Sequence, residues 1–229
     1  MPGNRIDGVA DAEDDAAAGS IVFANRVWAV KDSGAHRVGP GNNYFARASV
    51  AVEKEGLRLR ARTNHGRLEC AEVILRDDLS YGAYRFTVMS DLTRLASSLT
   101  LGMFLWSDND DFAHREIDIE AGRWGRPGNQ DMQFVLQPHT TPGNVLRFSL
   151  GAFNGPSVHE FTWTPGRIEF QTSNGHVVVK RFVVARGVPP PGGAQHVRIN
   201  LWNTAHELAE DGVAEVLLTD FCYEPGRQP

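Results

Sequence analysis

The chain has 229 residues, of which 41% are hydrophobic, and a formal net charge of −5. This length and apolar content are enough for one sizeable core and predict a single domain. The sequence has no basic stripe, so nucleic acid is not an expected partner. Its longest apolar runs fall far below the roughly 20 residues of a membrane span, so a membrane is not expected either.

Residues 1–19 are small, polar and acidic, and we expect them to be disordered, with residues 20–229 forming the single domain. The N-terminus has no apolar core region of the kind that marks a signal peptide, so none is expected in this chain, and its location stays undetermined. Cys70 and Cys222 lack the spacing of metal ligands and could form at most one disulfide. Two buried thiols are the favoured interpretation.

Short segments of strand composition, separated by Gly, Pro, Asn and Asp, follow one another through most of the chain. After a mixed segment at 21–30 they are, in chain order, 44–52, 57–62, 70–75, 83–89, 99–106, 132–137, 146–150, 159–163, 167–172, 177–184, 197–202 and 213–223. Segments 70–75 and 83–89 look like a pair joined by a turn, and 91–98 could form one short helix after the cap residue Asp91. Many short strands without alternating helices predict an all-β sandwich or barrel.

Residues 114–122 read HREIDIEAG and are the most informative stretch. Glu116, Asp118 and Glu120 alternate with Ile117 and Ile119, so a strand here would place the three acids on one face and the isoleucines on the other. Repulsion raises the cost of ionising all three carboxyls, so the row needs a compensating function. An edge strand with solvated acids is the simpler alternative, but the isoleucines and the apolar run 99–106 argue against it.

The spacing of these acids suits the cleavage of sugars. Retaining glycoside hydrolysis needs two carboxyl groups about 5–5.5 Å apart, one as nucleophile and one as acid/base. Residues four apart on a strand have Cα atoms about 13 Å apart, a gap that the long side chains of Glu116 and Glu120 could close over a twisted sheet. Asp118 between them could share a proton and help keep one neighbour protonated near neutral pH.

Five short motifs of this sequence occur in the same order in a known protein family. They are EIDIE at 116–120, CAEV at 70–73, YGAYRF at 81–86, FTWTPGRIEF at 161–170 and INLWN at 199–203. Together they resemble glycoside hydrolase family 16, the jelly-roll enzymes that include bacterial lichenases and laminarinases, over most of residues 44–224. The lichenase counterparts are EIDIE, CAEY, YGLYEV, FDWQPGYIKW and MNLWN. The resemblance implies a two-sheet antiparallel β-jelly-roll sandwich, like that of concanavalin A, with a concave glycan cleft.

The resemblance also implies roles for individual residues. Glu116 would be the nucleophile, Asp118 the assisting acid and Glu120 the general acid/base. Glu72 matches a glutamate that hydrogen-bonds sugar, and Trp202 matches a tryptophan of the cleft. The implied function is retaining hydrolysis of internal bonds in a β-linked polysaccharide, either a β-glucan or a related galactan.

The residues around the acids depart from the lichenase pattern. His114 stands where lichenases have a tryptophan, and Ile74 replaces an arginine. His114 could wall a sugar subsite, tune a carboxylate or simply pack. The cysteine that pairs with the CAEY cysteine in the family is also missing, so Cys70 is expected to be a free thiol.

Further candidates for sugar contacts come from the sequence near the acids. Trp124, in a polar loop, is a candidate platform for a sugar ring, and Gln133 and Gln137 could point into the cleft beside the acids. Trp106 is expected to pack in the core, as are two other tryptophans. These two are Trp28 and Trp163.

The expected chemistry requires no cofactor. The resemblance places a structural calcium ion near Asp220, for which an exposed strand-end acid is the alternative, and one carboxylate with backbone carbonyls could bind Ca²⁺. The expected partner is a polysaccharide and the chain is expected to be a monomer. Two alternatives stay open: a transglycosylase with the same site, or a carbohydrate-binding lectin without turnover.

Overall fold

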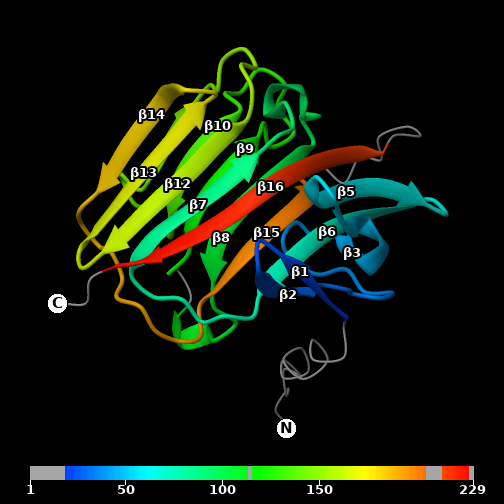
Figure 1. The fold of residues 1–229 in the computed structure, drawn as a ribbon, viewed down its shortest axis with the longest axis horizontal. Coiled ribbons are helices and arrows are strands. Elements are labelled where there is room, and N and C mark those ends of the chain that lie inside the picture. Colours follow the sequence, from blue (N-terminus) through cyan, green and yellow to red (C-terminus); the bar gives the residue numbers. More distant parts are fainter. Residues whose placement is uncertain (1–18, 113–114, 205–212, 227–229) are drawn as a thin grey trace, which may run out of the picture.

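The computed structural model describes residues 19–112, 115–204 and 213–226. They form two antiparallel sheets that pack face to face and are joined at one edge by the β5–β6 hairpin (Figure 1). The first sheet has the order β1-β2-β6-β15-β8-β9-β10-β11 and the second the order β4-β5-β16-β7-β12-β13-β14. The architecture is therefore the all-β two-sheet sandwich that the sequence predicts.

The strands of the first sheet are β1 (Ser20–Phe23), β2 (Arg26–Val30), β6 (Arg67–Leu75), β8 (Leu99–Trp106), β9 (Ile117–Gly122), β10 (Met132–Leu136), β11 (Val145–Phe148) and β15 (His196–Asn203). Those of the second are β4 (Val50–Glu53), β5 (Gly56–Asn64), β7 (Gly82–Val88), β12 (Ser157–Thr164), β13 (Arg167–Asn174), β14 (Val177–Val184) and β16 (Ala214–Pro225). The short β3 (Tyr44–Phe45) pairs with β6 in parallel. The other elements are single 3₁₀ turns, η1 (Arg47–Ser49), η2 (Leu92–Arg94) and η3 (Asp110–Phe112).

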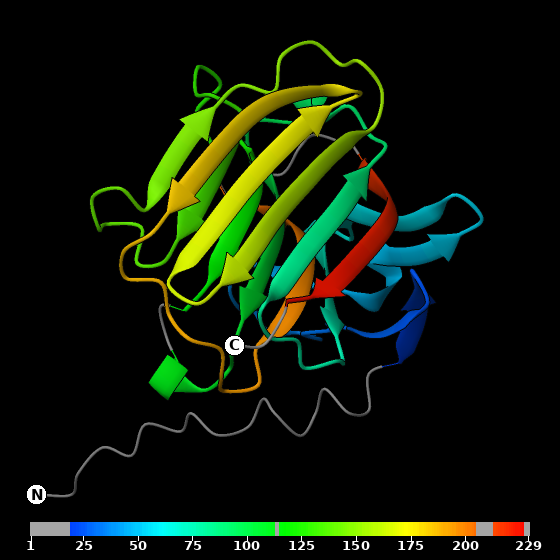
Figure 2. The same ribbon diagram turned by 60° about the vertical axis from the view of Figure 1, so that its left-hand side comes forward.

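Figure 2 shows the two sheets as two layers. Aromatic side chains pack in the core between them. Phe134 of the first sheet stacks on Phe170 of the second, with ring centroids 5.0 Å apart. Towards the other end, Trp28 meets Phe221 edge-on at 5.3 Å. Such pairs contribute about 0.5–1.5 kcal/mol each beyond the burial of their area. Trp163 is fully buried, and so the core positions expected for it and for Trp28 are confirmed.

The alternation of buried and accessible residues explains most of the strands. In β5, Leu57, Leu59 and Ala61 all face the core, as their spacing predicts. In β8, only Trp106 is exposed and the other seven residues are buried, so this strand is covered on both faces. No helix among the described residues is long and apolar enough to span a membrane.

Three local predictions were wrong. Residues 44–52 do not form one strand, because the turn η1 interrupts it before β4. Residues 91–98 form only the three-residue η2, whose Thr93 N–H donates to the Asp91 side chain as predicted for a cap. Residues 70–75 and 83–89 do not pair, because β6 lies in the first sheet and β7 in the second. A chain that crosses between sheets looks like a hairpin in sequence, since both need a short polar turn.

Both cysteines are free thiols, and the predicted absence of a Cys70 disulfide is confirmed. Cys70 is buried, and burial raises its pKa to about 12. Cys222 is only half-buried, so the expectation of two buried thiols holds for Cys70 alone. A thiol with so high a pKa is not a nucleophile at neutral pH.

Candidate active site

The three acids lie on a strand in the middle of the first sheet, since β9 pairs with β8 on one side and β10 on the other. Ile117 and Ile119 are fully buried in the core between the sheets. Alternation therefore turns Glu116, Asp118 and Glu120 to the opposite face, which we call the acid face. Glu116 directly precedes β9, and its carbonyl accepts a hydrogen bond from the Gln137 N–H at 3.0 Å. The alternative of an edge strand with solvated acids is excluded.

Asp118 is buried, whereas Glu116 and Glu120 are half-buried, and this burial changes the acidity of all three carboxyls. Burial is the main cause that raises the pKa of Glu116, of Asp118 and of Glu120. For Asp118 the neighbouring carboxylates add to the effect, and its pKa is raised well above the ordinary value. Asp118 also shares a side-chain hydrogen bond with Glu116, which lowers the pKa of Glu116 and raises that of Asp118. This shared bond thus opposes the effect of burial at Glu116 and adds to it at Asp118.

Two amides from β10 and its C-terminal end contact the acids. Gln133 Nε2 donates to Glu120 Oε2, and this bond opposes the effect of burial on the pKa of Glu120. Gln137 Nε2 donates to Asp118 Oδ2 over 3.4 Å. Both glutamines thus lie beside the acids, where the sequence predicts them. Their contact with sugar stays a prediction.

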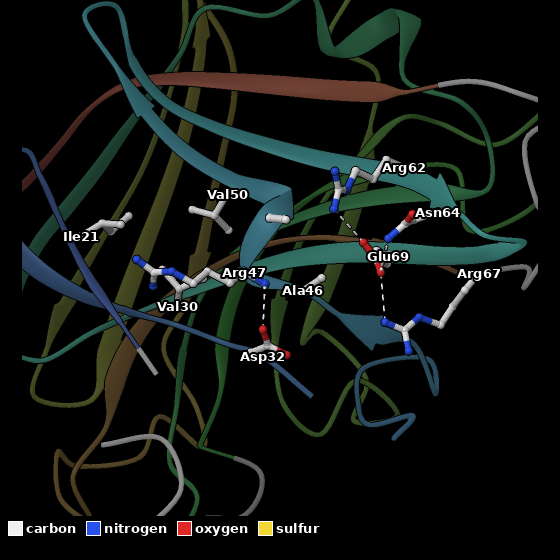
Figure 3. A pocket seen from close by; sticks show the side chains of 11 residues that line it. Ile21, Val30, Asp32, Ala46, Arg47, Val50, Arg62, Asn64, Arg67 and Glu69 are labelled. Atoms are coloured by element: carbon white, nitrogen blue, oxygen red, sulfur yellow. Dashed lines mark hydrogen bonds and ion pairs between the residues drawn. The ribbon is translucent and has the colours of Figure 1, made fainter. Parts of the chain in front are cut away.

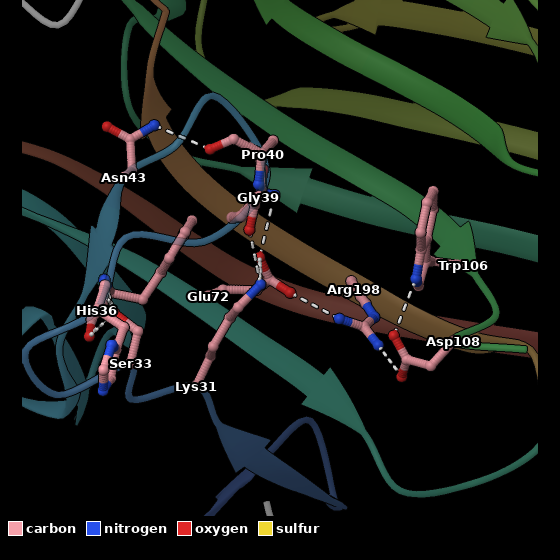
Figure 4. A network of polar contacts seen from close by, with 12 residues as sticks. Lys31, Ser33, His36, Gly39, Pro40, Asn43, Glu72, Trp106, Asp108 and Arg198 are labelled. Carbon is pink, nitrogen blue, oxygen red and sulfur yellow. Dashed lines mark hydrogen bonds and ion pairs between the residues drawn. The ribbon is translucent and has the colours of Figure 1, made fainter. Parts of the chain in front are cut away.

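A second polar cluster crosses the first sheet beside the acids (Figure 4). Glu72 of β6 is 1% exposed and receives hydrogen bonds from Arg198 Nη1 at 3.0 Å and from Lys31 Nζ at 3.3 Å. Arg198 Nη2 also donates to Asp108, which in turn accepts from Trp106 Nε1 at 2.9 Å. The sugar contact expected of Glu72 stays a prediction, because in this structure its carboxylate is engaged by protein groups.

Arg198 is the residue of this cluster that the sequence gave no reason to select. It lies directly opposite Ile74 in the β15–β6 register and opposite Phe104 in the β15–β8 register. Phe104 is in turn the partner of Asp118, so Arg198 lies on the acid face two strands away from it. Lichenases have an arginine at the position of Ile74, and in this chain Arg198 of the neighbouring strand lies opposite that position. Only the pairing of segments 70–75 and 197–202 could have revealed this.

Breaking the buried pair should destabilise the protein markedly. We expect Arg198→Met to lower the free energy of unfolding by about 3 kcal/mol, because it leaves the buried Glu72 charge with only the longer contact to Lys31. The matched change Arg85→Met removes a pair with Glu160 that is largely exposed and should cost no more than about 1 kcal/mol. Urea unfolding of both variants measures the difference. Equal losses of unfolding free energy in the two variants would show that the buried Glu72 pair stabilises the protein no more than the exposed pair does.

The tryptophans near the acids occupy different environments. Trp106 was expected in the core, but it ends β8 with 37% of its surface exposed, because alternation along the strand turns it to the acid face. Trp124 is half-buried in the loop after β9, and the Arg147 guanidinium lies 4.6 Å from its ring centre. Trp202 of β15 is half-buried and packs against Gly41, where an added Cβ would lie 2.7 Å from its ring. His114 lies outside the described residues.

Phe112 and Arg115, which precede the acid strand, contact residues of the segment 188–195. Gly193 has φ +74° and its Cα lies against the Phe112 ring, which leaves no room for a side chain there. Arg115 stacks on Phe112 at 4.3 Å and donates to the Pro190 carbonyl at 3.3 Å. Gln195 holds the Arg115 carbonyl at 3.1 Å, one residue before the first acid. These contacts set the entry of the chain into β9.

A hollow of about 610 Å³ lies away from the acids, between β2, η1, β5 and β6 (Figure 3). Both of its carboxylates accept hydrogen bonds. Arg62 and Arg67 each donate to Glu69 at 3.0 Å, and the Arg47 N–H donates to Asp32 at 3.3 Å. None of the three acids lines it, so this hollow is not part of the candidate active site.

The calcium ion that the resemblance implies near Asp220 finds little support in the side chains. Asp220 is exposed on β16, beside a register shift between Leu218 and Asp220. No group of three or more His, Cys, Asp or Glu suited to a metal ion occurs in the described parts of the chain. Asp220 would therefore have to bind Ca²⁺ with backbone carbonyls and water, and the site stays a prediction.

Chelation tests this prediction. If calcium binds at Asp220, excess EDTA should lower the melting temperature, and Asp220→Asn should remove that sensitivity, because a metal that binds only the folded state stabilises it. A melting temperature that EDTA leaves unchanged would count against the site.

Comparison with known proteins shows similarity at the level of structure. No protein-family model matches the sequence, and no curated protein matches it. Among solved structures, the β-glucanase of Bacillus licheniformis superposes with a TM-score of 0.68 and 18% identity, over 92% of this chain and 99% of that one. A prokaryotic β-1,3-1,4-glucanase (lichenase) from a mouse hindgut metagenome gives 0.63 and 17%, over 90% and 98%.

A third similar structure carries a different description. An immunostimulatory antigen and pseudo β-1,3-glucanase of Mycobacterium tuberculosis superposes with a TM-score of 0.55 and 19% identity, over 84% of this chain and 88% of that one. Identities this low establish the fold and not the activity. The chain therefore has the jelly-roll fold of the β-glucanases, with its three acids on a central strand of that fold.

Proposed function

We propose that this protein is a retaining glycoside hydrolase of family 16 that cleaves internal bonds of a β-linked polysaccharide, a β-glucan or a related galactan. One observation carries the proposal: three carboxyls with raised pKa values lie side by side on the acid face of a glucanase-like fold. A row of buried and half-buried acids destabilises a protein, and strongly perturbed carboxyls are typical of catalytic sites. Double displacement needs this combination of one ionised and one protonated carboxyl.

Glu116 is the nucleophile in this proposal. Its carboxylate attacks the anomeric carbon, while Glu120 donates its proton to the glycosidic oxygen and the bond to the leaving sugar breaks. Water then attacks the same carbon, Glu120 takes a proton from that water, and the Glu116 carboxylate is released. Asp118 keeps its proton throughout and stabilises the Glu116 carboxylate by donating to it. None of these steps requires a metal or an organic cofactor.

The acid face offers surfaces for a glycan chain on both sides of the acids. Trp106 is exposed beyond Glu116, and Trp124 lies in the loop beyond Glu120. Aromatic faces pack well against the C–H surfaces of sugar rings, so both could hold neighbouring sugar units. The set of proposed sugar contacts is completed by Glu72, His114, Gln133, Gln137 and Trp202.

Two other functions fit the same residues. A transglycosylase would pass the glycosyl group from Glu116 to a sugar instead of water. A lectin would bind the glycan without turnover, and the pseudo β-1,3-glucanase with a similar structure keeps this alternative open. The retained row of three acids favours turnover, since a binding module has no need of a row whose burial raises the pKa values of its carboxyls.

A panel of polysaccharides tests the proposal. β-1,3-glucan, mixed-linkage glucan, β-1,4-glucan and galactans are incubated with the protein, and released reducing ends and larger transfer products are measured. We expect reducing ends from at least one β-linked glycan. Transfer products without a net gain of reducing ends would identify a transglycosylase, and binding without turnover on every glycan would identify a lectin.

A further inference from the structure

A chain of side-chain contacts runs from Glu120 to the edge of the first sheet. In the paired strands, Glu120 of β9 lies opposite Gln133 of β10, and Gln133 lies opposite Arg147 of β11. Gln133 Nε2 donates to Glu120 Oε2, and Arg147 Nε donates to Gln133 Oε1 at 3.0 Å. The Arg147 guanidinium rests on the Trp124 ring at 4.6 Å. These four residues form what we call the Glu120 relay.

The chemistry of the relay fixes the orientation of the amide. A guanidinium has only hydrogen-bond donors, so the side of Gln133 that faces Arg147 must be its oxygen. The amide nitrogen must then face Glu120, and it can only donate. A Gln133 without Arg147 could turn over and present its oxygen to Glu120 instead, because the two ends of the amide have nearly the same shape.

This orientation distinguishes the two oxygens of Glu120. Oε2 accepts from Gln133, so it is the oxygen on which a negative charge is stabilised. The transferable proton then belongs on Oε1. Gln133 is 8% exposed and is thus held in place, whereas Arg147 is exposed and depends on Trp124 for its position.

Among the described neighbours of Glu120, no other charged side chain could orient Gln133 in this way. On its own strand the nearest acids are Asp118 and Glu116, while its partner on β8 is Gly102. Across the sheet, Gly102 is paired with Asn200 of β15, and Asn200 is paired with Glu72 of β6. Glu72 is therefore the first charged residue in that direction. Arg147 is the cation on the other side, and it acts on Glu120 through Gln133.

We propose that Gln133 and Arg147 are positioning residues that hold the Glu120 proton on Oε1 for transfer to the leaving sugar. This role rests on the proposed function of Glu120 as the acid/base. It predicts a loss that depends on the leaving group, because a sugar must be protonated as it departs while a dinitrophenolate need not be. A residue that only supports the fold would affect both substrates equally.

The test compares Arg147→Met, Arg147→Lys and Gln133→Ala on two substrates: the polysaccharide that the wild type cleaves, and a 2,4-dinitrophenyl β-glycoside of an oligosaccharide that it releases. We expect Arg147→Met and Gln133→Ala to lower kcat/KM on the polysaccharide by roughly 10- to 100-fold, a part of the 10²–10⁴-fold that acid–base catalysis supplies. On the activated glycoside the loss should stay below about 3-fold. Arg147→Lys, which keeps a donor and a positive charge, should recover part of the activity on the polysaccharide.

Arg181→Met is a matched control. Arg181 of β14 donates through Nε to Gln171 Oε1 of β13 at 2.7 Å, which is the same pair of groups across two strands of the other sheet. This variant should leave both substrates unaffected. Equal losses of Arg147→Met on the two substrates, or no loss, would overturn the relay while leaving the proposed function intact. A wild type that cleaves no glycan and no activated glycoside would overturn the proposed function itself.

Discussion

Glu116→Gln is expected to abolish hydrolysis, with kcat falling by roughly 10⁴-fold or more, the scale on which removal of a covalent nucleophile acts. The amide has nearly the shape of the carboxyl, but it carries no charge and cannot attack the anomeric carbon. In the proposed mechanism the hydrogen bond with Asp118 supports this role, because it opposes the effect of burial and lowers the pKa of Glu116. Initial rates of reducing-end release on the best glycan of the panel measure the loss.

Glu169→Gln provides the matched control for this change. Glu169 is exposed on β13 of the second sheet, where it pairs with Arg167, and its amide should not affect the rate. Adding azide to Glu116→Ala with an activated glycoside should restore turnover and yield an azide product of inverted configuration, because the small anion attacks from the vacated side. Activity that survives Glu116→Gln unchanged would show that another group is the nucleophile.

Asp118→Asn is expected to stabilise the protein at neutral and alkaline pH. The pKa of Asp118 is raised in the folded state, so the folded protein binds more protons than the unfolded chain and loses stability as the pH rises. The loss begins above the ordinary aspartate pKa of about 3.9 and amounts to about 1.4 kcal/mol per pH unit until the folded group itself ionises. Asparagine carries no such penalty, and its amide can still donate to Glu116.

Unfolding of the wild type and Asp118→Asn in urea from pH 4 to pH 8 measures this effect. We expect nearly equal stability at pH 4 and a growing advantage of the variant towards pH 8. Burial lowers the pKa of His159 to about 3, so both proteins lose stability below the ordinary histidine pKa, and this loss cancels in the difference. Asp77→Asn, which removes an exposed carboxylate paired with Arg26, should show no such trend. A difference that does not depend on pH would contradict the raised pKa of Asp118.

Much of the local structure could be predicted because it depends on neighbours in sequence. The alternation of Glu116 to Glu120 with two isoleucines predicts a strand with one buried face, and β9 has this form. The apolar run 99–106, which forms β8, argued that this strand does not lie at the edge of the sheet. The cap at Asp91 was likewise visible in a short motif.

The errors concern features that depend on distant residues. Whether segments 70–75 and 83–89 pair is decided by β15 and β16, which come more than a hundred residues later in the chain. Arg198 and Arg147 became visible only when register placed them beside Ile74 and Gln133. Trp106 was assigned to the core because its neighbours are apolar, although its place at the end of β8 leaves it exposed on the acid face. Sequence patterns thus identified the acids, and strand pairing identified the residues that surround them.

The stereochemistry of the first product tests the central claim most directly. Proton NMR during the first minutes of hydrolysis distinguishes the anomers of the new reducing end before they interconvert. Double displacement through Glu116 inverts the anomeric carbon twice, so a β-linked glycan should release the β-anomer first. Initial release of the α-anomer would mean that water attacks directly, and it would contradict Glu116 as a covalent nucleophile.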